Sequence, residues 1–348
     1  MYSKEINKVY SMEENPLKPP LRKENLGKIS AKIFGDSGAI EKFEPIPPYR
    51  KTNTYKCDLK GKQVILKYGS EEEWRNQEIA VKLSLNSPKI IGEQLVIREE
   101  KKPEKDEKPE ITENVWFAQE FIQNSKTLNE LMVEEGLSNA VIESFNKSTE
   151  LLAKIHGSLE LFLKQTELSW STHETVVSEF EERLKRFTEA LDKYDQIKEG
   201  NPDTKRWRSY LERIDKDALV YILEARSGNE VLVRWDYKPD NLLVQSQGTK
   251  VFSIDWQGLR VGGRWIDLGF LLSDLSKDKR PHYLETYLTA QRTNITHEEA
   301  LRNFQTAVVG AQFIHASSNA NTIIKDTHTN YNLQRLSDHL NQLGRELG

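Results

Sequence analysis

The hydrophobic pattern changes character near Ile122, and this change constrains the fold more than any other feature of the chain. Before Ile122, short apolar runs alternate with turn residues, which is typical of antiparallel strands. After it, apolar residues recur at spacings of three and four, as in Leu152, Ile155 and Leu159, which is typical of amphipathic helices. Strands followed by helices predict an α+β protein with two lobes.

We predict that residues 1–122 form the N-terminal lobe, a five-stranded antiparallel sheet with one helix at 71–85, preceded by a loose lead-in at 1–23. Residues 123–348 are predicted to form a mainly helical C-terminal lobe, with single helices at 137–162, 174–198 and 203–226. The mixed-charge run at 99–110 is predicted to be a solvated hairpin tip.

Composition excludes several classes of protein. The chain of 348 residues is 37% hydrophobic and 30% charged, which is typical of a globular protein. Its net charge of −4 gives no reason to expect a nucleic-acid partner. A single cysteine, Cys57, excludes an internal disulfide and fits a reducing compartment. Because no apolar run approaches the roughly 20 residues that span a bilayer, we expect a cytoplasmic protein without a membrane partner; the sequence does not predict its oligomeric state.

Three polar residues accompany two short apolar strands at 242–244 and 251–254. Asp236 and Asn241 precede the first strand, and Asp255 follows the second. Each residue taken alone is explained by a turn, because Asp and Asn are common turn formers. Pairing of the strands, however, would bring Asn241 and Asp255 to one end of a hairpin, where an amide oxygen and a carboxylate suit magnesium (Mg²⁺).

Phosphoryl transfer from a nucleotide requires such a set of side chains. One carboxylate orients the attacking hydroxyl, while an amide and a second carboxylate hold Mg²⁺ against the phosphates. We therefore predict a kinase, with Asp236 as the catalytic base, Asn241 and Asp255 as metal ligands, and a hydroxyl group as the phosphate acceptor.

Lys67 lies within the apolar strand 64–68, where a lysine ordinarily points to solvent. Its context changes this interpretation, because Glu78 lies on the same helix face as Trp74 and Val81 and would need a partner there. A Lys67–Glu78 ion pair would satisfy both residues and direct the ammonium at nucleotide phosphates. Glu72 and Glu73 are the alternative partners.

Four segments occur in an order that resembles a known superfamily. They are Leu-Leu-Ala-Lys-Ile-His at 151–156, the run 236–244, Ile-Asp-Trp-Gln at 254–257, and Gly-Gly-Arg-Trp-Ile-Asp-Leu at 262–268. Together they resemble the aminoglycoside phosphotransferase and choline kinase superfamily, which has a protein-kinase-like fold. The third and fourth segments also resemble its ecdysteroid-kinase-like branch.

The resemblance implies a role for each matching residue. Asp236 corresponds to the base, Asn241 and Asp255 to the metal ligands, Lys67 to the phosphate-binding lysine and Glu78 to its helix partner. The backbone of Glu120, Phe121 and Ile122 would bind adenine, and the cofactors would be ATP, or alternatively GTP, with Mg²⁺. The phosphate acceptor would be a hydroxyl group of a small molecule. Asp267 resembles a buried aspartate that braces the catalytic loop, although a surface helix cap is the competing interpretation. His156 is expected to pack structurally.

The sequence also departs from the family pattern. Arg234 stands where the family usually has His, and Trp235 replaces a small residue. Lys238 resembles the lysine with which Ser/Thr protein kinases neutralise the transferred phosphate, and we expect it to act in catalysis. The loop that would cover the phosphates lacks G-x-G-x-x-G, so Thr52, Asn53 and Thr54 are the predicted donors there. A glycine-poor loop approaches phosphates less closely, which predicts weak nucleotide affinity.

The acceptor is the least constrained part of the prediction. The acidic residues of the helix at 174–198 either favour a cationic acceptor or form an ordinary solvated face; they are Glu179, Glu182, Glu189 and Asp192. Two alternatives to a small-molecule kinase stay open: a non-catalytic nucleotide- or ligand-binding protein on the same fold, and a Ser/Thr protein kinase. Against the latter, the chain has Asp-Trp-Gln in place of Asp-Phe-Gly and no Ala-Pro-Glu segment.

Overall fold

The structure of the chain is a computed structural model that divides into two compact units. The sheet unit comprises residues 1–125 and 252–257, and the helical unit comprises 126–251 and 258–348. The residues described are 21–46, 53–101, 110–197, 202–226, 229–245, 249–292, 295–324 and 330–348. The sequence placed all of 123–348 in one lobe, whereas Phe252–Gln257 groups with the sheet unit.

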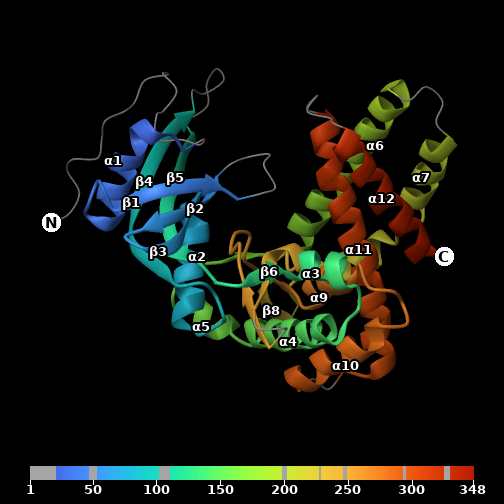
Figure 1. Cartoon of the computed structure of the whole chain (residues 1–348). Helices are drawn as coiled ribbons and strands as arrows, with labels where there is room; N and C mark the ends of the chain where they lie inside the picture. Colours follow the sequence, from blue (N-terminus) through green and yellow to red (C-terminus); the bar gives the residue numbers. More distant parts are fainter. Residues whose placement is uncertain are drawn as a thin grey trace. The chain divides into compact units, whose positions relative to one another are not determined.

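The sheet unit is built on a five-stranded antiparallel sheet, as predicted (Figure 1). Its strand order is β1-β2-β3-β5-β4. The strands are β1 (Ile40–Pro45), β2 (Thr54–Leu59), β3 (Lys62–Ser70), β4 (Ile90–Lys101) and β5 (Glu110–Glu120). Part of the predicted hairpin tip at 99–110 lies outside the described residues.

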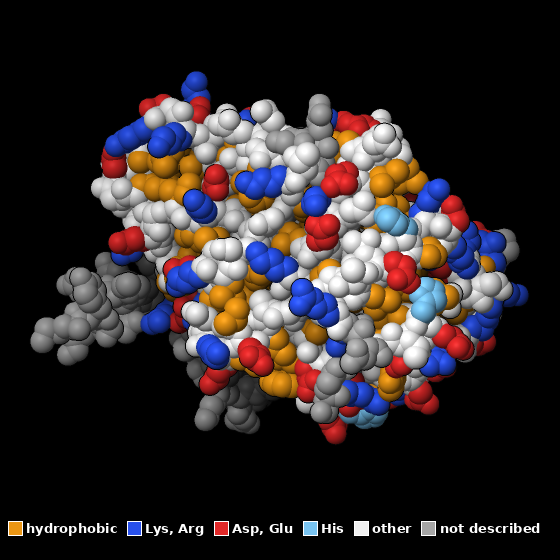
Figure 2. Space-filling model, turned by 90° about the horizontal axis from the view of Figure 1, so that it is seen from below, with side chains coloured by type: hydrophobic (Ala, Val, Ile, Leu, Met, Phe, Trp, Pro, Cys, Tyr) orange, Lys and Arg blue, Asp and Glu red, His pale blue; other side chains and the backbone are white. Residues whose placement is uncertain are grey.

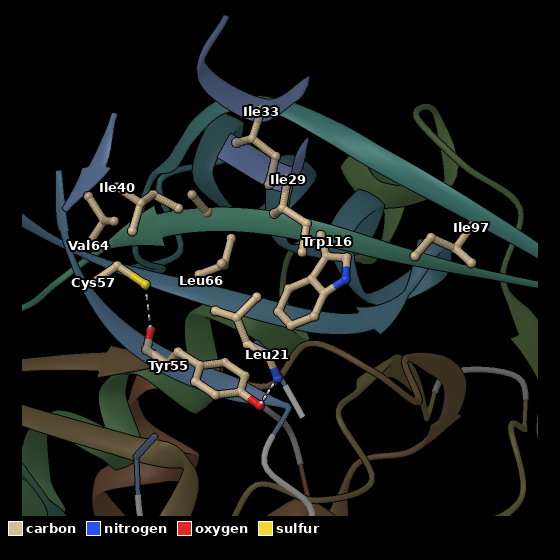
Figure 3. Close-up of a cluster of buried hydrophobic side chains, with 11 residues drawn as sticks. Leu21, Ile29, Ile33, Ile40, Tyr55, Cys57, Val64, Leu66, Ile97 and Trp116 are labelled. Atoms are coloured by element: carbon tan, nitrogen blue, oxygen red, sulfur yellow. Dashed lines mark hydrogen bonds between the residues drawn. The ribbon is translucent and has the colours of Figure 1, made fainter. Parts of the chain in front are cut away.

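Helix α1 (Lys23–Phe34) packs its apolar face onto this sheet. Ile29 and Ile33 are buried against a cluster that includes Trp116 of β5 (Figure 3). The backbone N–H of Leu21 donates to the Tyr55 hydroxyl at 2.6 Å, which fixes the entry to the helix. Each large apolar side chain buried here contributes about 1.5–3 kcal/mol to stability.

Helix α2 (Glu71–Lys82) begins where the Ser70 hydroxyl accepts the backbone N–H of Glu73. Its buried face carries three polar side chains, Glu73, Asn76 and Gln77, together with Ile79 and Ala80. The face predicted from sequence, through Trp74, Glu78 and Val81, is only half-buried. The prediction followed the apolar residues, whereas the buried polar side chains all have partners within the sheet unit.

The helical unit contains ten helices within its described residues. They are α3 (Leu128–Glu135), α4 (Asn139–His156), α5 (Leu159–Leu163), α6 (His173–Ile197), α7 (Pro202–Glu212), α8 (Lys216–Leu223), α9 (Trp265–Leu272), α10 (Arg280–Gln291), α11 (His297–Ile324) and α12 (Asn330–Leu347). Two segments predicted as single helices, 137–162 and 203–226, are each divided into two.

Helix α11 is the centre of this unit, packing against α6, α9 and α12 (Figure 1). Its contact with α9 requires Gly269, because a Cβ there would lie 2.5 Å from the Ala307 carbonyl oxygen. All eight residues of α9 are buried, so this helix is a rigid support for whatever its side chains hold.

Short strands carry the segments that the sequence analysis singled out. Strand β11 (Arg260–Gly263) lies between β7 (Ser169–Trp170) and β8 (Glu230–Val233). Strand β9 (Leu242–Gln245) lies between β6 (Ser125–Thr127) and β10 (Lys250–Ser253). A 3-10 turn at Pro239–Asn241 precedes β9.

The surface has the mixed charge that the composition predicts. On the face drawn in Figure 2, acidic and basic side chains are interspersed among apolar and neutral ones. Among the described residues, no helix combines the length and the apolar character needed to cross a bilayer.

Candidate active site

The sheet unit holds a buried lysine between two carboxylates. Lys67 of β3 forms an ion pair with Glu73 of α2, and its Nζ lies 3.5 Å from Oδ1 of Asp255, 188 residues along the chain. The side chains of Lys67 and Glu73 are only 14% and 2% exposed. Burial alone would lower the pKa of Lys67, but the charges of Asp255 and Glu73 outweigh it and raise that pKa. Burial raises the pKa of Glu73 to about 7.

The predicted partner Glu78 is not the partner in the structure. Glu78 pairs instead with Lys82 of the same helix at 3.3 Å, and its side chain is 39% exposed. Because α2 begins directly after its cap at Ser70, Glu73 faces the sheet in the first turn, and Glu78 is turned away from it. The prediction of an ion pair between Lys67 and Glu78 was therefore wrong. Glu73, one of the two alternative partners, pairs with Lys67 instead.

Gly69 makes this ion pair sterically possible. A Cβ at this position would occupy the space that the Glu73 carboxylate fills. Because side chains cannot share that volume, any larger residue at this position would push the carboxylate away from Lys67.

Asp255 is held in the sheet unit by the residue that follows it. The carbonyl oxygen of Trp256 accepts a hydrogen bond from Nδ2 of Asn76 at 3.2 Å. The indole N–H of Trp256 donates to the Ser253 carbonyl at 3.0 Å. Asp255 itself has φ 64°, a left-handed conformation that costs energy in a residue with a Cβ. The backbone is thus turned sharply at the carboxylate that faces Lys67.

Two of the three predicted phosphate-covering residues adjoin Lys67. Thr54 is the direct register partner of Lys67 across β2 and β3. The Asn53 carbonyl accepts the Tyr68 N–H at 2.7 Å, and its side chain accepts the Thr54 hydroxyl at 3.3 Å. Thr52 lies outside the described residues.

The predicted adenine-binding segment leaves β5 at the same sheet. The Glu120 N–H already donates to the Lys89 carbonyl at 2.8 Å, and the Ile122 carbonyl accepts the Ser125 hydroxyl at 2.7 Å. Phe121 lies under the Lys56 ammonium, which is 4.9 Å from the ring centroid. The Glu120 N–H is therefore committed within the protein, and we expect the neighbouring backbone groups to carry any base recognition.

The helical unit holds the loop that carries Asp236. Its carboxylate receives Nζ of Lys238 at 2.8 Å and Nδ2 of Asn241 at 2.9 Å. Nδ2 of Asn241 also donates to the Asp236 carbonyl at 2.9 Å. Because both of these oxygens can only accept, the amide nitrogen must face them, and the Asn241 amide oxygen is turned away from Asp236.

Asp267 braces this loop from α9. It is fully buried and accepts the backbone N–H groups of Arg234 at 2.6 Å and Trp235 at 2.9 Å. His156 lies 3.2 Å from the same carboxylate through Nε2 and 2.6 Å from the Tyr287 hydroxyl through Nδ1. A surface helix cap is excluded by this burial, and the bracing role that the resemblance implied is found.

His156 is held as a neutral ring. Burial lowers the pKa of His156, and this effect exceeds the opposing one of Asp267. A carboxylate can only accept, so Nε2 carries the proton and Nδ1 accepts the Tyr287 hydroxyl. His156 was expected to pack structurally, but nothing in the sequence pattern indicated Tyr287 as its partner.

The two unusual residues before Asp236 have separate environments. Arg234 is buried, with 1% exposure. Trp235 has φ 60°, and its ring lies under the Arg260 guanidinium at 4.3 Å. Arg260 in turn pairs with Glu179 of α6 at 2.8 Å. Arg260 was not among the predicted site residues, because no local pattern links it to a residue 25 positions earlier.

The predicted magnesium ligands have suitable chemistry. Asn241 offers an amide oxygen turned away from Asp236, and Asp255 offers a carboxylate that is 25% exposed. Among the described residues there is no cluster of three His, Cys, Asp or Glu side chains able to hold a metal.

Comparison with known proteins supports the resemblance. The model of a phosphotransferase enzyme family matches residues 141–304, which include Asp236, Asn241, Asp255 and Asp267. No curated protein matches the chain by sequence.

Solved structures share its fold at low sequence identity. The choline kinase LicA from Streptococcus pneumoniae is 16% identical, with a TM-score of 0.53 over 91% of this chain and 96% of that one. A spectinomycin phosphotransferase solved with ADP and spectinomycin is 14% identical, with a TM-score of 0.55 over 94% of each chain. An aminoglycoside 2'-phosphotransferase solved with GDP is 14% identical, with a TM-score of 0.58 over 93% of this chain and 97% of that one.

The fold and the matched family define the class: a phosphotransferase that acts on hydroxyl groups. Within that class, the family match supports the resemblance to the aminoglycoside phosphotransferases, and the solved structures confirm the kinase-like α+β fold. The coarse activity is that of a small-molecule phosphotransferase.

Proposed function

We propose that this chain transfers the γ-phosphate of ATP to a hydroxyl group of a small molecule. A bond forms between the acceptor oxygen and the γ-phosphorus, the bond from that phosphorus to the β,γ-bridging oxygen breaks, and ADP leaves. Asp236 takes the proton of the hydroxyl. Lys238, whose Nζ lies 2.8 Å from Oδ1 of Asp236, offsets the negative charge that develops on the transferred group.

The observation that carries this proposal is the set of Lys67, Glu73 and Asp255, in which the Lys67 ammonium lies between two carboxylates. Removing the Lys67 ammonium from water costs desolvation free energy, which its ion pairs often do not fully repay. This arrangement therefore indicates a function other than stability. Two carboxylates also exceed what one ammonium needs, so Asp255 has capacity left for a cation. Lys67 would bind a phosphate oxygen, with Asn53 and Thr54 as further donors beside it.

Mg²⁺, when bound, neutralises the phosphate oxygens and orients the γ-phosphate. Asn241 would hold it through the amide oxygen that faces away from Asp236, and Asp255 through its carboxylate. The backbone of Glu120, Phe121 and Ile122 would bind the base. ATP is the proposed donor, and GTP is the alternative to compare with it, because one neighbouring structure was solved with GDP.

Thermal unfolding with nucleotide tests the donor site. We expect Mg²⁺-ATP to raise the melting temperature of the wild type, and Asp255→Asn to lose most of that rise, since it removes a metal ligand and a partner of Lys67. The melting temperature without nucleotide controls for folding. No shift at millimolar nucleotide would refute the donor site and favour a ligand-binding protein without catalysis.

Turnover tests the base. ADP release should be measured against a panel of small hydroxyl compounds, with Asp236→Asn as the comparison. We expect this variant to keep nucleotide binding and to lose about 10²–10⁴ in turnover, the usual contribution of a positioned base. Equal turnover in the two proteins would show that Asp236 is not the base. Labelled phosphate on a generic protein substrate would favour a Ser/Thr protein kinase instead.

A further inference from the structure

Trp235, the residue directly before the proposed base Asp236, has a backbone conformation that a tryptophan rarely adopts. Its φ is 60°, in the left-handed region, where the Cβ of a residue other than glycine is crowded by its own backbone. Such a conformation persists only where the surrounding structure holds it. Because the dihedral angles of Trp235 set the direction in which the chain continues, whatever holds this residue also directs Asp236.

The backbone of Trp235 is held on its N-terminal side by Asp267. The N–H of Trp235 donates to Oδ1 of this buried carboxylate at 2.9 Å, and the N–H of Arg234 donates to Oδ2 at 2.6 Å. These two hydrogen bonds fix the peptide plane that leads into Trp235. They do not fix the rotation φ about the next bond, which carries both the indole and the residue that follows.

The indole of Trp235 is held by Arg260 of β11. The guanidinium carbon of Arg260 lies 4.3 Å from the centroid of the ring, within the range of a cation–π contact. Among the residues that the structure describes, none accepts a hydrogen bond from the indole N–H of Trp235. The orientation of the ring therefore depends on packing and on the charge over its face.

Arg260 is itself fixed at both of its ends. Its backbone is the register partner of Val233 in β8, two residues before Trp235. Its Nη1 forms an ion pair with Oε1 of Glu179 in α6 at 2.8 Å, and the Arg260 side chain is only 21% exposed. A guanidinium is planar and always charged, so it can stack on a ring while it pairs with a carboxylate. Arg260 thus joins the indole to two other elements of the helical unit.

We propose that Arg260 is a positioning residue for the transfer step, which acts through Trp235 to hold Asp236 where it accepts the proton of the acceptor hydroxyl. Asp267 fixes the peptide plane before Trp235, and Arg260 fixes the rotation that follows it. This role rests on the proposed function, because it requires Asp236 to be the base. Arg260 touches neither the nucleotide nor the acceptor in this role.

Removal of the charge over the ring should lower turnover and leave nucleotide binding unchanged. A cation–π contact changes a conformational equilibrium by about two- to thirtyfold, so Arg260→Gln should lower kcat by a factor in that range. ADP release is measured with the acceptor of highest turnover in the panel of hydroxyl compounds. KM for Mg²⁺-ATP, and the rise in melting temperature with Mg²⁺-ATP, should stay as in the wild type, because Lys67, Glu73 and Asp255 belong to the sheet unit. Arg260→Lys keeps a cation and should have a kcat between those of the wild type and Arg260→Gln.

A double-mutant cycle separates positioning from a general loss of structure. Trp235→Leu removes the ring, so Arg260→Gln should have no further effect on kcat in that background. Lys216→Gln is the matched control, because it removes another cation that pairs with α6, at 2.7 Å from Glu181, but from α8 rather than from β11. This control should keep the kcat of the wild type.

Hydrogen–deuterium exchange measures the loop without any acceptor. In the peptide that spans residues 234–242, the backbone N–H groups of Trp235, Lys238 and Asn241 are hydrogen-bonded within the protein. They should exchange about two- to thirtyfold faster in Arg260→Gln, and at the wild-type rate in Lys216→Gln.

Four results would overturn the inference. They are an equal kcat in Arg260→Gln and Lys216→Gln, an equal loss of kcat from Arg260→Gln with and without the Trp235 ring, unchanged exchange of the loop in Arg260→Gln, and a loss of Mg²⁺-ATP binding in that variant. Turnover that survives Asp236→Asn would instead overturn the proposed function. The exchange measurement would still decide in that case whether Arg260 holds the loop.

Discussion

Glu73 and Asp267 are both buried carboxylates next to proposed active-site residues, one in each unit, yet they are satisfied in different ways. Glu73 faces a cation, Lys67, whereas Asp267 receives two backbone N–H groups and a neutral histidine. An ammonium has three donors and can share them with a bound phosphate. Backbone groups cannot be shared in this way, so Asp267 fixes the shape of the loop while Glu73 leaves its partner available to a ligand.

The largest effect is expected from Asp267→Asn. An amide offers a single acceptor oxygen and presents an N–H₂ group to backbone N–H donors, so buried donors lose their partner. We expect a loss of about 2–4 kcal/mol in the free energy of unfolding, together with nearly complete loss of turnover. Urea unfolding followed by tryptophan fluorescence measures the first quantity. Asp278→Asn, at an exposed position, is the control, and equal stability of the two variants would refute the bracing role.

Glu73→Gln and Glu78→Gln form a matched pair on α2. Glu73→Gln leaves Lys67 with Asp255 as its carboxylate partner and should weaken Mg²⁺-ATP binding or turnover about ten- to a hundredfold. Glu78→Gln removes a half-exposed pair with Lys82, which contributes less than about 1 kcal/mol, and should act like the wild type. The same loss in both variants would contradict the assignment of Glu73.

The smallest effect concerns the pH dependence of stability. Burial lowers the pKa of His156 below its usual 6.5, so as the pH falls through 6.5 the unfolded state binds more protons than the folded state, by up to one. The stability due to the neutral ring is therefore complete above pH 6.5 and is lost as the pH falls, by at most about 1.4 kcal/mol per pH unit. Unfolding between pH 5 and 8 should show a shallower slope in His156→Gln, and an unchanged slope would exclude this role.

Much of the fold was predictable because its signals are local. Apolar runs separated by turn residues gave the five strands of the sheet unit, and helical spacing located the longer helices. The break between α7 and α8 was missed, although Asp215 caps α8 by accepting the Ala218 N–H at 2.9 Å. The sequence contains this capping residue, but the prediction followed the apolar residues, which continue on both sides of it.

The site was predictable only in part. Local sequence was enough to predict Asp236 and Asn241, which lie in one short segment, and Asp267, which lies in the next one. In the structure, Asn241 donates to Asp236, and Asp267 of α9 accepts two backbone N–H groups of the same loop. Glu78 was preferred to Glu73 as the partner of Lys67 because a hydrophobic pattern cannot locate a helix face that is buried and polar. Glu73, Asn76 and Gln77 occupy that face, and each is satisfied by a residue distant in sequence or across a turn.

The close approach at Gly69 has a consequence for how related sequences vary. The carboxylate of Glu73 fills the volume where a side chain at position 69 would begin, so the two positions cannot mutate independently. Homologues that keep an acidic residue at the place of Glu73 should keep glycine at the place of Gly69. Homologues that acquire a side chain at position 69 should carry the acidic residue at another position of the helix. Substitutions at the two positions should therefore be correlated.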